Sequence, residues 1–239
     1  MSLVIERLAE PITPITQGER DYAEIQQKPQ PERIPKYYFR HKETGAEYSW
    51  IEGAFSPPGY QYPGYAVIIG MDRQEDPKYK THFIRGLEEF ETEQLTDIEG
   101  LIKGCIALKG KYGAYPLLEQ GFYSELTEAT SERVYNTISR LYGEKSEFWP
   151  IPGPYSEHPQ SFQQYVMTLA HYKKILDISQ CPKLKNYMLM IKDGRDLLKM
   201  KPEENPAIAA IAYAVSTLIH MRPWQFESYD AVWEMEDEY

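Results

Sequence analysis

One short segment constrains the fold of this 239-residue chain more than any other. Residues 65–72 read Tyr-Ala-Val-Ile-Ile-Gly-Met-Asp, a continuous apolar run that ends in a carboxylate. Such a run is typical of a central strand that is buried on both faces of a sheet. Apolar side chains at helical spacing recur later, for example at Ile98, Leu101, Ile102 and Cys105. Strands that alternate with helices predict an α/β domain with a mixed central sheet flanked by helices.

Further elements follow from periodicity and capping signals. Residues 37–48 predict a hairpin that turns near Thr44 and Gly45, and residues 50–65 predict an ordered loop packed by its aromatic rings. Short strands are expected at 81–90, 115–119, 148–155 and 174–179. Helices are expected after Thr96 as N-cap, from about Ser131, from Ser161, over 184–191 and over 208–219.

The chain divides into three regions by composition. Seven prolines interrupt the first sixty residues, so we interpret 1–60 as a Pro-rich arm or linker with a possible hairpin. Residues 1 to about 35 are the part expected to be arm or linker. Residues 61–222 are expected to form the folded domain. Residues 223–239 form an acidic tail with interleaved aromatic residues, which is either solvated or a docking segment.

Charge and cysteine content narrow the class of protein. The chain has 26 Lys and Arg against 36 Asp and Glu, a formal charge of −10, which disfavours nucleic-acid binding through a broad basic face. Its two cysteines exclude a disulfide framework and favour a reducing cytoplasm. No apolar run approaches the roughly 18 residues of a membrane-spanning helix, so no membrane partner is expected.

Two carboxylates follow apolar runs that predict strands. Asp72 ends the run at 65–72, and Glu119 follows Tyr115-Pro-Leu-Leu. In open α/β sheets, side chains at the carboxyl ends of strands converge on the ligand-binding crevice. Carboxylates gathered there repel one another unless a cation lies between them, and Mg²⁺ and Mn²⁺ prefer oxygen ligands. The alternative interpretation is that each acid ends a strand at the surface.

The order of these pieces resembles the C-terminal nuclease domain of phage terminase large subunits, which has an RNase H-like fold. The resemblance covers about residues 60–220. It rests on the segments 65–72, 83–91 (Phe-Ile-Arg-Gly-Leu-Glu-Glu-Phe-Glu) and 115–119, and on the closing segment Glu203-Glu-Asn-Pro-Ala-Ile-Ala-Ala-Ile-Ala-Tyr-Ala-Val. It implies a metal-dependent endonuclease that cuts double-stranded DNA during genome packaging in the cytoplasm of a bacterial host cell.

The resemblance also implies the site residues. Asp72 matches the first-strand aspartate and Glu119 takes the middle acidic position. Aligning on Ala212-Tyr213-Ala214 places Asn205 where the family has an acid, and Glu204 is the carboxylate that can substitute, with Glu203 as a weaker candidate. These residues would bind two Mg²⁺ or Mn²⁺ ions. An asparagine carbonyl is a neutral and poorer ligand, so Asn205 would weaken the second ion.

A second hypothesis comes from the features of the sequence that do not fit an active nuclease. Asn205, the acidic balance and the aromatic acidic tail also fit a nuclease-like fold that has lost catalysis and acts as an interaction module in virion assembly. Another RNase H-like enzyme, such as a resolvase, is a third. No segment of the sequence reads as the ATPase domain that precedes the nuclease in terminases, so either the gene encodes a separate nuclease-like protein or only a piece is present. The expected partners are a terminase ATPase, a small terminase subunit or a portal protein.

Overall fold

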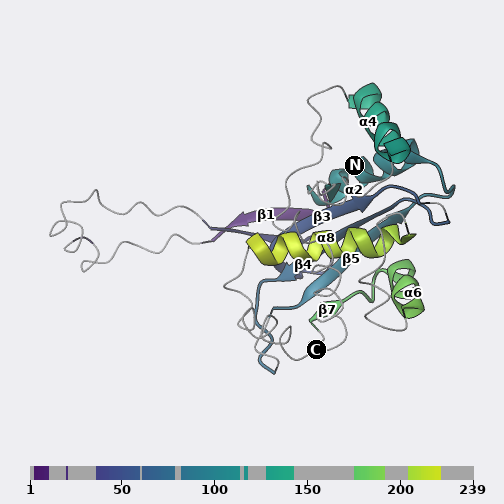
Figure 1. Ribbon diagram of the computed structural model, residues 1–239. Coiled ribbons are helices and arrows are strands. Elements are labelled where there is room, and N and C mark those ends of the chain that lie inside the picture. Colours follow the sequence, from purple (N-terminus) through teal and green to yellow (C-terminus); the bar gives the residue numbers. More distant parts are fainter. Residues whose placement is uncertain are drawn as a thin grey trace.

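A computed structural model describes residues 3–10, 20, 36–59, 61–78, 82–113, 116–117, 128–142, 175–191 and 204–221. Its centre is a mixed sheet with four helices packed around it (Figure 1). The strands are β1 Ile5–Ala9, β2 Tyr37–His41, β3 Glu47–Ser56, β4 Tyr65–Asp72, β5 Ile84–Glu91, β6 Pro116–Leu117 and β7 Leu176–Asp177. The helices are α2 Ile98–Tyr112, α4 Glu128–Tyr142, α6 Pro182–Met190 and α8 Pro206–Met221.

The strand order is β1-β2-β3-β4-β5-β7, and β6 pairs with β3 outside this path. Strands β1 to β5 pair with one another in chain order, and each of these four pairs is antiparallel. In contrast, β6 runs parallel to β3, and β7 runs parallel to β5. Because β3 and β4 are antiparallel, β6 and β4 point in opposite directions. This relation decides which strand ends lie at the same end of the sheet.

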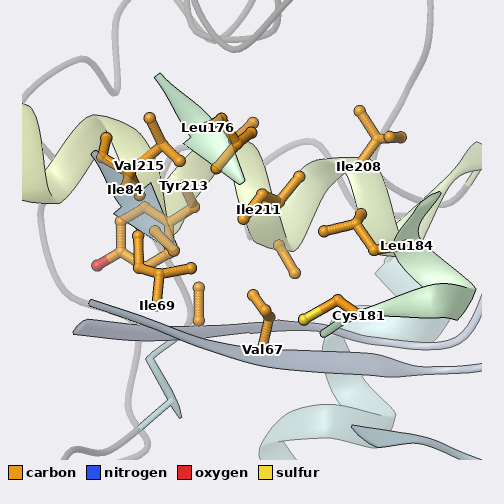
Figure 2. Close-up of a cluster of buried hydrophobic side chains, with 14 of the residues drawn as sticks. Val67, Ile69, Ile84, Leu176, Cys181, Leu184, Ile208, Ile211, Tyr213 and Val215 are labelled. Atoms are coloured by element: carbon orange, nitrogen blue, oxygen red, sulfur yellow. The ribbon is translucent and has the colours of Figure 1, made fainter. Parts of the chain in front are cut away.

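Helices cover both faces of the sheet. Val67 and Ile69 of β4 point into one core with α8 and α6, while Ala66 and Ile68 point into a second core with α2 and α4. This alternation follows from the two-residue period of a strand. The first core contains most of the small and branched side chains of α8, which lies across β3 and β4 (Figures 1 and 2).

The structure confirms the predicted α/β class and several elements. The run at 65–72 is the buried strand β4, and the run within 81–90 is β5. The hairpin at 37–48 is formed by β2 and β3, with Gly45 at a φ of 72° in its turn. The predicted helices at 184–191 and 208–219 are α6 and α8, and β7 lies within 174–179.

Two helices differ from prediction only at their starts. Helix α2 is capped by Asp97 rather than Thr96, because the Asp97 carboxylate accepts a hydrogen bond of 2.7 Å from the backbone of Gly100. It ends at Tyr112, and Gly113 follows as its C-cap in the left-handed conformation, with a φ of 71°. Helix α4 begins at Glu128, three residues before the predicted Ser131.

The first sixty residues contain the main correction. Residues 5–9, predicted to belong to an arm, form β1, which pairs along its whole length with β2. Residues 50–56, predicted as loop, continue β3, which pairs with β4 through Ser56. The prediction failed because it rested on the proline content of the region. The strand conformation of these residues depends on pairing with β2 and β4, which local sequence does not show. Three predictions lie outside the described residues: the strand at 148–155, the helix from Ser161 and the acidic tail.

Among the described helices, none is long and apolar enough to cross a membrane.

Candidate active site

Asp72 lies in an ion-paired cluster at the end of β4. Arg85 of β5 donates to both of its carboxylate oxygens through Nε, at 2.9 Å each, and the Arg85 Nη2 atom lies 2.8 Å from Oδ2. The Nη1 atom of Arg85 donates to Asp177 of β7 at 2.7 Å. One guanidinium therefore joins the ends of three strands.

The pKa shifts in this cluster reflect the pairing. The hydrogen bond to Asp72 raises the pKa of Arg85 above its usual range. Burial opposes ionisation of Asp177, but hydrogen bonds from Ser179 and Arg85 outweigh it and lower the pKa of Asp177. Asp72 is thus already neutralised by a cation that belongs to the protein, so a metal ion would have to compete with Arg85.

The sheet also places Asp72 far from the strand that precedes Glu119. Asp72 lies opposite Tyr48 on β3, whereas Leu117, the last residue of β6, lies opposite Ala54. Six residues along β3 correspond to roughly 20 Å at about 3.3 Å per residue. The predicted convergence assumed that both strands finish at the same end of the sheet. Strands β4 and β6 instead finish at opposite ends. The strand-end argument therefore does not hold for Asp72.

The other predicted site residues lie as follows. Glu119 lies two residues after β6 and outside the described residues. Glu204, immediately before Asn205, is exposed. Asn205 is buried, and its Oδ1 atom accepts a hydrogen bond of 3.2 Å from the backbone of Ile208. Asn205 therefore acts as the N-cap of α8.

The start of α8 lies toward the same part of β3 as β6. Figure 2 shows Ile208, near the start of the helix, on the side of Leu184 and Cys181, Val67 below Ile211, and Val215 on the side of Ile69 and Ile84. Val67 pairs with Ala54 of β3, the residue that β6 also reaches. The beginning of α8 and the end of β6 are therefore directed to one end of the sheet, opposite to Asp72.

Sequence reasoning missed one partly buried carboxylate on the face of the sheet that α8 covers. Glu52 lies in the middle of β3, between Trp50 and Ala54, on the face that α8 covers. Its Oε2 atom accepts from the indole nitrogen of Trp50 at 3.2 Å, and its Oε1 atom accepts from the backbone nitrogen of Gly53 at 3.1 Å. Burial, the largest influence, raises the pKa of Glu52 in spite of both hydrogen bonds.

A signal for Glu52 was present in the sequence. It stands in the segment Tyr-Ser-Trp-Ile-Glu-Gly-Ala-Phe, which is rich in strand-forming residues, and an ionisable group in the middle of such a segment is costly to bury. Residues 50–65 were predicted to form a loop, so Glu52 was not considered as a residue within a strand. The candidate carboxylates were taken from the ends of predicted strands instead. Glu52 is partly buried, and a carboxylate that is desolvated in this way is a candidate functional group.

These residues differ in how well they fit a divalent cation. The described hydrogen bonds use one lone pair on each oxygen of Glu52, and a carboxylate oxygen has two. Glu52 therefore fits a ligand role, whereas Asp72 is paired with Arg85 and Asn205 caps a helix. Within the described ranges, no group of three or more His, Cys, Asp or Glu is arranged to hold a metal. The predicted set of ligands also includes Glu119, which lies outside those ranges.

Comparison with known proteins adds no relative. No protein-family model, curated protein or solved structure matches the chain. The functional argument therefore rests on the sequence pattern and on the geometry described above.

Proposed function

We propose that this chain is a terminase-like, metal-dependent endonuclease with an RNase H-like fold, which hydrolyses phosphodiesters of double-stranded DNA during genome packaging. The observation that carries the proposal is the pairing of β6 with β3. An RNase H-like sheet has three antiparallel strands, then a helix, then a strand parallel to the first. Strands β3, β4 and β5, helix α2 and strand β6 follow that order.

This order makes β3, not β4, the first strand of the nuclease core. The first-strand acid is then Glu52 rather than Asp72, and Glu52 lies two residues from Ala54, which pairs with β6. Glu119 after β6 and Glu204 before α8 are the further carboxylates that the resemblance implies. Bound Mg²⁺ or Mn²⁺ would supply Lewis-acid activation of water and stabilisation of the developing phosphate charge.

The chain's own residues prepare this site in two ways. Trp50 and Gly53 hold the Glu52 carboxylate, and burial beside α8 favours binding of a cation that offsets its desolvation. Asn205 fixes the first turn of α8 and thereby the position of Glu204. Partners in this function would be DNA and a terminase ATPase, small terminase subunit or portal protein, in the cytoplasm of the bacterial host.

The test is manganese-dependent nicking of supercoiled plasmid by four proteins. The wild type and Asp72→Asn are expected to nick, whereas Glu52→Gln is expected to lose nicking by at least about 100-fold, as for loss of a metal-binding carboxylate. The matched control is Glu47→Gln, which removes a carboxylate from the same strand that pairs with Arg40 and Arg73 instead. Loss of nicking in Asp72→Asn with retention in Glu52→Gln would return the first-strand role to Asp72.

A second candidate function is an inactive nuclease-like module that acts in virion assembly. The capping role of Asn205, the exposure of Glu204 and the pairing of Asp72 with Arg85 favour it. It predicts neither nicking nor Mn²⁺ binding by the wild type. Calorimetry with MnCl₂ alone distinguishes the two functions, because an active site requires binding that Glu52→Gln removes.

A further inference from the structure

Helix α6 carries two adjacent apolar side chains that are unusually exposed. Leu189 is 72% exposed and Met190 is 64% exposed, whereas the other exposed large apolar side chains in the described ranges are only 44–46% exposed. Single exposed apolar residues are common on protein surfaces. Two neighbours at this exposure instead form a contiguous apolar surface, which is typical of a site that contacts another segment or protein.

The rest of this helix face is polar and basic. Lys185 and Asn186 lie four residues before Leu189 and Met190, so these four exposed side chains share one face, which we call the outer face of α6. Helix α6 contains two lysines and no acidic residue. Its opposite face is buried, because Leu184 packs in the core that α8 covers. The outer face therefore fits a partner that is both apolar and negatively charged.

The chain itself contains a segment of that chemistry. Residues 223–239 have six acidic residues and no lysine or arginine. Four aromatic residues are interleaved with the acids, namely Trp224, Phe226, Tyr229 and Trp233. Aromatic rings can cover the exposed apolar side chains of α6 while the neighbouring carboxylates lie beside its lysines. Complementary charge of this kind steers two surfaces together and fixes their register.

This segment is also long enough to reach α6. Ile208, in the first turn of α8, packs in the same core as Leu184 of α6. About 20 Å of helix separates Ile208 from Met221, where α8 ends, and α6 is about 13 Å long. Residues 222–239 span up to roughly 60 Å when extended. The segment can therefore return along α8 and contact the outer face of α6 in the same molecule.

We propose that the outer face of α6 is a docking site for the acidic aromatic segment 223–239 of the same chain. The aromatic side chains cover Leu189 and Met190, and the carboxylates lie beside Lys185 and the start of the helix. Docking within one molecule is favoured because the connection keeps the local concentration of the segment high. The docking site is independent of the proposed function, since none of the proposed metal ligands takes part in it.

The test is photo-crosslinking in the full chain, with p-benzoylphenylalanine in place of Leu189. An equal mixture of ¹⁴N-labelled and ¹⁵N-labelled protein is irradiated, and the crosslinked peptides are identified by mass spectrometry. Position 189 is expected to join residues 223–239 of a chain with the same isotope. The matched control has the probe at Tyr135, which is 46% exposed on α4 and should give no crosslink to 223–239. Thermal unfolding shows that both labelled proteins are folded.

A charge reversal tests the basic part of the site. Lys185→Glu should lower the yield of the crosslink from position 189 at least about 2-fold, since an exposed ion pair is replaced by repulsion. Lys103→Glu, at a lysine of α2 that is 64% exposed, should leave the yield unchanged. Crosslinks to another segment, crosslinks between chains of different isotope, or no crosslink would each overturn the proposal. An equal yield in Lys185→Glu and in the unsubstituted background would overturn it as well.

Discussion

Removing a glutamate carboxylate from water in the middle of a sheet costs free energy, and hydrogen bonds from its neighbours offset this desolvation only in part. Trp50 and Gly53 both donate to Glu52, yet burial dominates and the pKa of Glu52 is raised. Asp72 shows the opposite solution, because Arg85 supplies a cation directly. The difference between these two acids, one desolvated and one neutralised, is the physical basis for preferring Glu52 as a metal ligand.

The raised pKa of Glu52 predicts a specific dependence of stability on pH. Between the ordinary value of 4.5 and its raised value, the folded state binds more protons than the unfolded state, so stability falls as pH rises through that interval. Glu52→Gln lacks this titration, so the stability of the wild type relative to Glu52→Gln should fall as pH rises from 4 to 7. Urea unfolding of both proteins at pH 4 and pH 7 measures this change. Parallel pH curves for the two proteins would contradict the prediction.

At the scale of elements, Arg85 attaches β7 to the rest of the sheet. It pairs with Asp72 on β4 and with Asp177 on β7, and these three side chains are 38%, 21% and 36% exposed. Arg85→Leu leaves two carboxylates without their cation. We expect a loss of about 1–2 kcal/mol in the free energy of unfolding, between the values for exposed and for buried pairs.

Arg85→Lys is the matched control, because it keeps the charge without the forked geometry, and its loss should be intermediate. Hydrogen exchange gives the local readout. The amide of Ile84 donates to the carbonyl of Ile175, just before β7, and should exchange faster in Arg85→Leu. Unchanged protection of Ile84 would show that the ion pairs do not hold β7.

Helix α6 is attached to β5 by a carboxylate at its first turn. Glu89 accepts from the backbone nitrogens of Lys183 and Leu184, at 2.8 and 2.9 Å, and from the hydroxyl of buried Tyr65 at 2.6 Å. Glu89→Ala is expected to destabilise by about 2–3 kcal/mol, because the Tyr65 hydroxyl is then buried without its acceptor.

A double-mutant cycle isolates that contribution. Adding Tyr65→Phe to Glu89→Ala removes the unsatisfied hydroxyl, so the double variant should lose less than the sum of the two single losses. Chemical unfolding of the four proteins gives the coupling. Simple additivity would mean that Glu89 acts only on the helix terminus.

Prediction from the sequence succeeded where local pattern and tertiary structure agree. The continuous apolar run at 65–72 and the helical stripe of α8 are strong local patterns, and both elements formed as expected. It failed in β3, where Trp50 to Ser56 gain their strand conformation from pairing with β4. The same failure affected the candidate site, because the role of Glu52 depends on the direction of β6 relative to β3, which no local pattern encodes.

At the scale of the whole molecule, the N-terminal strand β1 contributes to the core between the sheet and α2. The backbone nitrogen of Val4 donates to the carbonyl of Lys111 in the last turn of α2, and the nitrogen of Lys42 donates to the carbonyl of Val4, both at 2.8 Å. Ile5 is 3% exposed and packs in the core between the sheet and α2. Strand β1 therefore connects the outer ribbon of the sheet to a helix on its face.

This connection predicts that a change in β1 lowers the stability of the entire domain. Ile5→Ala should reduce the free energy of unfolding by about 2–4 kcal/mol in a single cooperative transition, since it leaves a cavity in the α2 core. Leu3→Ala, two residues earlier and 45% exposed, should cost less than about 0.5 kcal/mol. Urea unfolding followed by both circular dichroism and tryptophan fluorescence measures the two variants. If residues 3–10 were only an arm beside the domain, Ile5→Ala would leave the midpoint unchanged, because none of the core would depend on its side chain.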